Sequence, residues 1–126
     1  MAKSKTSVHA VSKCRKLVKL PLCRHNANGR HVFEKKCAFC HGADGQGTMA
    51  APPLWGPRSY TIGAGMARVG VAASFIKANM PRGWGWTVTD DEAFDVAAYV
   101  NGQSRPDFPG KVNDWPQGGK PADVPY

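Results

Sequence analysis

The sequence predicts a small all-α domain with three to five short helices joined by long loops. The chain has 126 residues, which is enough for one small domain. Its 14 glycines and 10 prolines are many for this length and favour irregular connections. Apolar residues recur at helical spacing in three segments, whereas strand-like alternation is almost absent. We expect a tail at residues 1–27, the domain at 28–104 and an extended C-terminal segment at 105–126.

The positive charge of the chain is concentrated at its N-terminus. Residues 1–36 contain ten Lys and Arg and one acid, Glu34, for a charge of +9, whereas residues 37–126 carry −1. The net charge of +8 therefore belongs to a leader and not to a face of the folded domain. We expect residues 1–27 to be a basic, disordered tail, and we expect no specific binding of nucleic acid.

The first predicted helix begins at Asn28, a candidate N-cap, and ends near Gly42. Val32 and Phe33 put apolar groups on one side of it at helical spacing. Residues 43–70 are rich in Gly, Pro and Ala and have no periodicity, and so long a loop is unusual unless it wraps a bound group. A second helix is predicted over residues 71–80, because a proline follows it.

The clearest helix follows Thr89. Glu92 stands three residues after this threonine, which is the pattern of a capping box. The pair Asn101 and Gly102 marks the end of the helix. Its predicted apolar stripe consists of Phe94, Ala97, Ala98 and Val100. After it, residues 105–126 are punctuated by prolines and should lie over the surface of the domain.

A Cys-x-x-Cys-His motif occupies Cys37, Cys40 and His41. A thioredoxin-like dithiol would follow a β-strand and open a helix, whereas here a helical segment precedes the motif. A zinc site needs four ligands, usually as two separated pairs, and no second close pair follows. A chance occurrence of the motif is a third alternative. The additional zinc ligands would have to be found upstream, among Cys14, Cys23, His25 and His31.

Covalent haem attachment is the interpretation that accounts for most features of the chain. Two thiols at this spacing can add to the vinyl groups of one porphyrin, and the adjacent histidine can bind the iron as proximal ligand. A large flat cofactor would also supply much of the core in a domain with few regular elements. We therefore predict one haem c, attached through Cys37 and Cys40 and ligated by His41.

A haem in such a domain usually takes a second axial ligand from a methionine. Met49 lies too close to the attachment motif for the chain to pass around the ring. Met80 is 39 residues after His41, at the end of a predicted helix. We predict Met80 as the distal ligand, with Met66 as the alternative. Trp84, close to Met80 in the sequence, is a candidate for the wall of the haem site.

At these residues the sequence resembles the class I c-type cytochromes. The resemblance covers about residues 28–103 and includes "CAFCH", "PPLWG", "NMP" and "DEAFDVAAYV". It implies a cytochrome c fold, in which short helices and long loops wrap around one covalent haem.

The resemblance also implies two specific contacts. The carbonyl of Pro52, two residues before Leu54, should accept a hydrogen bond from Nδ1–H of His41, which fixes the imidazole tautomer. The first and last helices should cross nearly at right angles, with Gly29 or Phe33 against Tyr99.

A narrower likeness is to the second haem domain of thiosulfate dehydrogenases. It is carried by "PPLWGPRSYTIGAGMARVG", "FIKANMP", "DDEAFDVAAYV" and the closing "RPDFPGKVNDWPQGGKPADVPY". The likeness implies an enzyme that couples two thiosulfates to tetrathionate and passes two electrons through two haems. This chain has one Cys-x-x-Cys-His motif, so catalysis would require a second haem domain or subunit, whereas a role in electron relay would not.

The leading functional hypothesis is therefore a mono-haem cytochrome that carries single electrons between redox partner proteins. Those partners would be another cytochrome or an oxidase or dehydrogenase. The alternative is a haem domain or fragment of a thiosulfate dehydrogenase, and a third class is a zinc- or nucleic-acid-binding protein that uses the basic tail. Arg58, Arg68, Lys77 and Arg82 are candidates to contact haem propionates or an acidic partner.

We expect the domain to work in the bacterial periplasm, where covalent haem is installed after export. No apolar run reaches the ~18 residues of a transmembrane helix. The N-terminal residues also lack the continuous apolar stretch of about 7–15 residues that is typical of a signal peptide. The periplasmic expectation thus depends on the haem motif, without a visible signal peptide in this chain.

Overall fold

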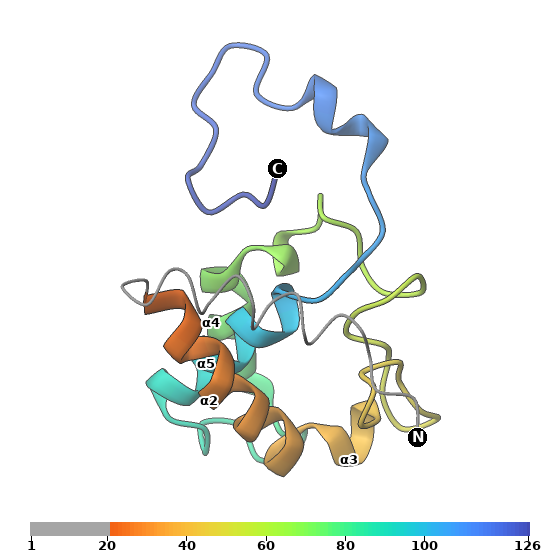
Figure 1. Cartoon of the computed structure of the whole chain (residues 1–126), viewed down its shortest axis with the longest axis vertical. Helices are drawn as coiled ribbons and strands as arrows, with labels where there is room; N and C mark the ends of the chain where they lie inside the picture. The colour runs from red at the N-terminus through yellow and green to blue at the C-terminus, as the bar shows by residue number, and fades with distance from the viewer. Residues whose placement is uncertain (1–20) are drawn as a thin grey trace.

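The computed structural model describes residues 21–126, and their side chains from residue 27 onward. Over this part of the chain the regular elements are all helical, and no strand is present. This confirms the predicted all-α fold (Figure 1). The elements are α2 (Pro21–Lys36), α3 (Ala38–His41), the 3₁₀ helix η1 (Gly65–Ala67), α4 (Val69–Asn79), α5 (Asp90–Asn101) and the 3₁₀ helix η2 (Pro109–Asn113).

Helix α2 begins at Pro21 and not at Asn28, so the predicted helix start was wrong. Proline suits the first helical turn, because its missing N–H would have no partner there and its φ is already helical. Asn28 lies within the helix and is not its cap; its side-chain amide donates a hydrogen bond to the Asp95 carboxylate of α5. Residues 21–27, expected in the tail, are thus part of α2, whereas residues 1–20 lie outside the described part.

Helices α2 and α5 pack against each other at Gly29. A Cβ atom at Gly29 would lie 2.0 Å from the backbone oxygen of Asp95 and 2.7 Å from Cβ of Tyr99. The two backbones can come this close only because Gly29 has no side chain. The Phe33 and Tyr99 rings lie beside this point, with centroids 5.7 Å apart. The expected contact of the first and last helices is confirmed, and it joins a core cluster of Val32, Phe33, Val96 and Val100.

Helix α5 has the predicted capping box. The Thr89 hydroxyl accepts a hydrogen bond from Glu92 N at 3.1 Å, and the Glu92 carboxylate accepts one from Thr89 N at 3.0 Å. The predicted apolar stripe was wrong at Phe94, whose residue surface is 52% exposed. The prediction is confirmed at Ala97 and Val100, whereas Ala93 and Val96 are buried in place of Phe94 and Ala98. Alanines let α4 and α5 approach closely where a phenylalanine ring would not fit. The members of the buried stripe are Ala93, Val96, Ala97 and Val100, and on α4 the facing residues are Ala72 and Ala73.

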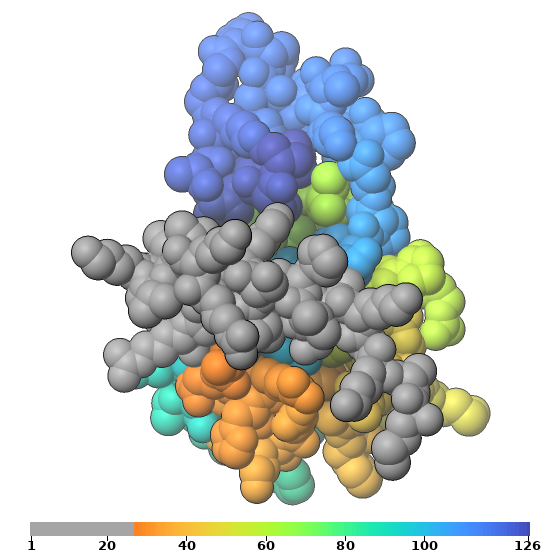
Figure 2. Space-filling view, viewed as in Figure 1, coloured from red at the N-terminus to blue at the C-terminus, as the bar shows by residue number. Residues whose placement is uncertain are grey.

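The C-terminal segment leaves α5 through Arg105. The Arg105 guanidinium donates hydrogen bonds to the carbonyl oxygens of Leu54 at 3.3 Å and Val100 at 2.8 Å, and it lies 4.1 Å from the centre of the Tyr60 ring. The following residues form one end of the molecule, drawn in blue in Figure 2. Arg68, which precedes α4, ties this segment back through an ion pair to Asp123 at 2.8 Å. In the described residues, no helix is both long enough and apolar enough to cross a membrane.

Candidate functional site

The Cys-x-x-Cys-His motif forms a tight turn directly after α2. Cys37 stands between α2 and α3, its N–H donating to the Phe33 carbonyl at 2.9 Å, and its own carbonyl accepts from His41 N at 3.0 Å. Cys37 is half-buried, Cys40 is exposed and His41 is buried, with 8% of its surface exposed. Helical geometry thus brings the two thiols and the imidazole of the motif together in little more than one turn.

His41 has a defined orientation because the loop after it folds back. Its Nδ1 lies 2.8 Å from the carbonyl oxygen of Pro52, the contact that the family resemblance implies. A carbonyl can only accept, so Nδ1 carries the proton and Nε2 keeps its lone pair for a metal. The loop is closed by hydrogen bonds from Gly47 N to the His41 carbonyl and from Leu54 N to the Gly45 carbonyl, each at 2.8 Å.

Burial raises the pKa of the Cys37 thiol to about 11, with a smaller lowering influence from Lys36. A redox dithiol of the thioredoxin type works through a thiol whose pKa is lowered so that the thiolate forms near neutral pH. Cys37 has the opposite property, and neither Cys37 nor Cys40 is in a disulfide. The environment therefore disfavours the dithiol interpretation and is compatible with thiols that are consumed by covalent attachment.

Met80 and Met66 have different surroundings. Met80 caps the C-terminal end of α4, where its N–H donates to the Ile76 carbonyl at 2.9 Å, and it is half-buried. Its peptide bond to Pro81 is cis. Met66 lies in η1 and packs against the core cluster between α4 and α5, and its carbonyl accepts from the Asn101 amide at 2.9 Å. Met66 therefore acts as a core residue, and Met49 is fully exposed.

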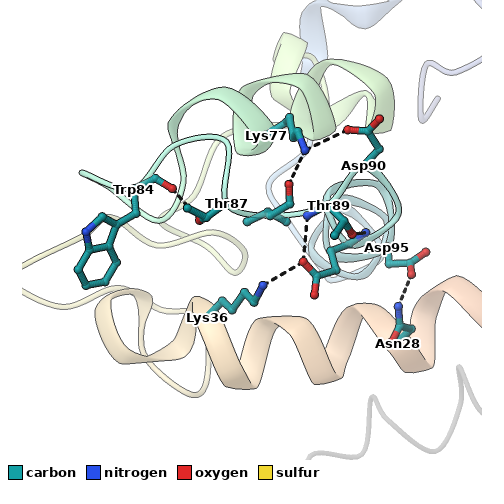
Figure 3. A network of polar contacts seen from close by, with 10 residues as sticks. Asn28, Lys36, Lys77, Trp84, Thr87, Thr89, Asp90 and Asp95 are labelled. Atoms are coloured by element: carbon teal, nitrogen blue, oxygen red, sulfur yellow. Dashed lines mark hydrogen bonds and ion pairs between the residues drawn. The ribbon is translucent and has the colours of Figure 1, made fainter.

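Large apolar side chains are exposed on α4 and the loop that follows it. Val71 and Phe75, one turn apart on α4, are 41% and 44% exposed. Trp84 and Trp86 in the loop after Met80 are 72% and 70% exposed, and Figure 3 shows the Trp84 indole directed away from α4 and α5. Such side chains favour burial against another apolar surface.

The residues present therefore fit a haem. They offer two thiols, an imidazole with a free Nε2, a thioether and apolar side chains on the element that leads to the thioether. Leu54 packs on the Val32 and Phe33 cluster next to the histidine loop. Among the residues with described side chains, no three of His, Cys, Asp and Glu form a group that could hold a metal ion. The upstream zinc candidates Cys14, Cys23 and His25 lie outside those residues.

Three of the four predicted cationic candidates have partners within the described residues. Arg68 pairs with Asp123, and Arg58 donates to the Gln46 carbonyl at 3.0 Å. Lys77 donates to the Val88 carbonyl at 2.6 Å, a contact that the sequence does not suggest, because its partner is a backbone atom. Arg82 is exposed.

Comparison with protein families gives a match over residues 24–100 to the family described as "Cytochrome C oxidase, cbb3-type, subunit III". The chain belongs to this cytochrome c family. Membership implies covalently bound haem c, which agrees with the chemistry of the motif. The family match also confirms the predicted cytochrome c fold. The sequence and structure relatives confirm the likeness to the second haem domain of thiosulfate dehydrogenases.

The relatives of this cytochrome c domain include thiosulfate dehydrogenases. That of Psychrobacter arcticus is 46% identical over 103 residues, which are 77% of this chain and 32% of the relative. That of Stutzerimonas stutzeri is 48% identical over 88 residues, 66% of this chain and 29% of the relative. The solved thiosulfate dehydrogenase TsdBA of Marichromatium purpuratum superposes with a TM-score of 0.63 and 42% identity over 78% of this chain and 23% of that one. The chain thus spans about a third of the length of these curated relatives.

Proposed function

We propose that the chain is a mono-haem c-type cytochrome that carries single electrons between redox partner proteins. The observation that carries this proposal is the single Cys-x-x-Cys-His motif whose histidine is oriented by Pro52, with Nε2 free. One motif accounts for one haem. Membership of a cytochrome c family supports the same chemistry.

Four side chains would hold the haem. Cys37 and Cys40 would form the thioethers, and Nε2 of His41 and the Met80 sulfur would be the axial ligands. When bound, the haem supplies one-electron cycling between ferric and ferrous iron. A thioether ligand raises the reduction potential relative to a second histidine. With both axial positions filled by the chain, no position is left for a substrate, which favours electron transfer over catalysis.

The apolar side chains of the site would exclude water. Leu54 on the histidine side, Val71 and Phe75 on α4, and Trp84 in the loop after Met80 would cover the porphyrin. Fixed axial ligands and a dry cofactor keep the rearrangement small when the electron moves. The partner would dock at an exposed edge of the haem, in a small and weak encounter. Attachment of haem c after export supports the periplasm as the place where the domain works.

The proposal is tested with the whole chain, produced in a host that attaches haem c. The mass under denaturing conditions should increase by one haem, and the ferric protein should show the weak near-infrared band of methionine ligation. Met80→Ala should abolish this band, whereas Met66→Ala should keep it. A colourless product would overturn the proposal, and a band lost only with Met66→Ala would overturn the ligand assignment.

The likeness to thiosulfate dehydrogenases favours a second candidate, a haem domain or fragment of such an enzyme. The chain matches about a third of each curated relative, which leaves the other two thirds without a counterpart in these 126 residues. Thiosulfate added to the ferric protein should reduce its haem slowly or not at all if the chain is a carrier. Rapid reduction of the haem by thiosulfate alone would favour the enzyme.

A further inference from the structure

Lys77 connects the last turn of α4 to the start of α5. It stands three residues before Met80, and its Nζ donates a hydrogen bond to the Val88 carbonyl at 2.6 Å (Figure 3). The same Nζ lies 3.2 Å from Oδ1 of Asp90. The Lys77 side chain is only 26% exposed, whereas that of Asp90 is 85% exposed. The contact with Val88 is therefore the stronger of the two, because solvent screens the ion pair.

The backbone of Lys77 also holds the loop that connects α4 and α5. The Lys77 carbonyl accepts a hydrogen bond from Trp86 N at 2.8 Å. Next to it, Gly85 lies so close to α4 that a Cβ atom there would be 2.2 Å from the Ala78 carbonyl oxygen. The loop is braced internally by the Thr87 hydroxyl, which donates to the Trp84 carbonyl at 2.7 Å. The loop that starts at Met80 is thus folded back onto the last turn of α4, with Lys77 bound to it at two points.

These contacts are placed to fix the direction in which Met80 leaves the helix. Met80 is the residue at which α4 ends, with extended backbone angles (φ −116°, ψ 146°). The α4 backbone holds the Met80 N–H, through the hydrogen bond to the Ile76 carbonyl at 2.9 Å, whereas the chain that follows Met80 is held by the loop contacts. If the loop came away from α4, that one hydrogen bond would be left to hold Met80 at the helix.

We propose that Lys77 is a positioning residue for Met80, and that its hydrogen bond to Val88 keeps the thioether aligned for the iron. This inference rests on the proposed function, in which Met80 is an axial ligand. Lys77 does not touch the cofactor in this proposal; it acts by holding the loop. The sequence made Lys77 a candidate to contact a haem propionate or an acidic partner. In this proposal it instead anchors the loop from inside the protein.

The experiment uses Lys77→Met in the haem-loaded chain, because methionine keeps the apolar stem and removes the donor. The measurement is the affinity of ferric protein for imidazole, which competes with Met80 for the iron. We expect imidazole to bind about tenfold more tightly, equivalent to about 1.4 kcal/mol. Lys77→Arg, which keeps a cationic donor, should restore at least part of the wild-type affinity.

The matched control is Lys111→Met, which removes a lysine paired with Asp107 in the C-terminal segment, away from the loop. It should leave imidazole affinity unchanged. Thermal unfolding is recorded for all variants. A Lys77→Met protein with a lowered Tm but wild-type imidazole affinity would overturn the inference, because the role would then be structural only. Absence of the near-infrared band in the wild type would instead overturn the proposed function, so the two failures are distinguishable.

Discussion

The close approach of α2 to α5 at Gly29 predicts that Gly29→Ala destabilises the protein. Alanine is favoured over glycine within a helix by about 1 kcal/mol, so propensity alone predicts a more stable protein. The new Cβ would, however, lie 2.0 Å from the Asp95 carbonyl oxygen, where real Cβ contacts are essentially never below 3.0 Å. Helices α2 and α5 must then move apart by about 1 Å, which is the difference between these two distances.

That separation loosens the core cluster at the crossing. Overpacking of a well-packed core costs about 1–3 kcal/mol, and the upper end applies here because the obstacle is backbone and cannot rotate away. After the gain in helix propensity is subtracted, Gly29→Ala should lower the free energy of unfolding by about 2 kcal/mol. The assay is guanidinium unfolding of the haem-loaded protein, followed by far-ultraviolet circular dichroism.

The matched control is Gly70→Ala in the first turn of α4, where a Cβ atom would meet nothing within 4 Å. This variant should be as stable as the wild type or gain up to about 1 kcal/mol. If Gly29→Ala were equally harmless, the two helices would not cross backbone to backbone, and the description of the core would be wrong.

Three further substitutions test the polar contacts. Thr89→Ala should lower the free energy of unfolding by about 1 kcal/mol, and an unchanged Tm would contradict the capping box. The pKa of Glu92 is lowered, first by the hydrogen bond from the Thr89 backbone and then by Lys36, so its contribution to stability is present above the usual pKa of 4.5. This contribution disappears as the pH falls through the lowered pKa. The difference in the free energy of unfolding between wild type and Glu92→Gln should therefore shrink in acid. A difference that stays constant from neutral to strongly acidic pH would refute the prediction. Arg105→Lys should cost about 2 kcal/mol in urea unfolding, because lysine cannot reproduce the bonds of the guanidinium or its stacking on Tyr60.

The features that the sequence predicts well are those set by local chemistry. The capping box needs only Thr89 and Glu92, which interact within one turn. The contact of His41 with Pro52 follows from a short loop whose pattern the family resemblance supplies. The crossing of α2 and α5 also follows from that resemblance, and the absence of a side chain at Gly29 is its physical reason.

The features that sequence reasoning missed depend on packing or on backbone partners. Basic residues around Pro21 suggest a tail, although proline and its neighbours are compatible with a helix that packing then stabilises. Phe94 is the most hydrophobic residue at the start of α5, and sequence patterns therefore place it in the core. The structure buries the neighbouring Ala93 instead, because two closely packed helices have room only for small side chains there. The partner of Lys77 is a carbonyl oxygen eleven residues away, and no side-chain pattern can reveal it.

The two proposed axial ligands are held by different kinds of contact. His41 is fixed by its own loop, through hydrogen bonds to residues no more than eleven positions away. Met80 stands at the end of a helix, and its direction depends on the loop being held against α4. Both sets of contacts are equally local in sequence, because Lys77 and Val88 are also eleven positions apart. The difference is that the His41 ring takes part in its own hydrogen bond, whereas Met80 is positioned through the contacts of neighbouring residues. On the methionine side, constant coordination would therefore depend on contacts that other residues make.

The N-terminus of α5 braces both sides of the site. At the end of α2, directly before the attachment motif, Lys36 reaches Glu92 at 2.9 Å. Glu92 in turn accepts from Thr89 N at 3.0 Å, and the neighbouring Val88 carbonyl receives the Lys77 hydrogen bond at 2.6 Å (Figure 3). One short stretch of chain thus contacts both the helix that presents the thiols and the helix that presents the thioether. In the proposed one-electron carrier, both sides would have to stay in place when the iron changes charge, and a shared brace would meet that need with few residues.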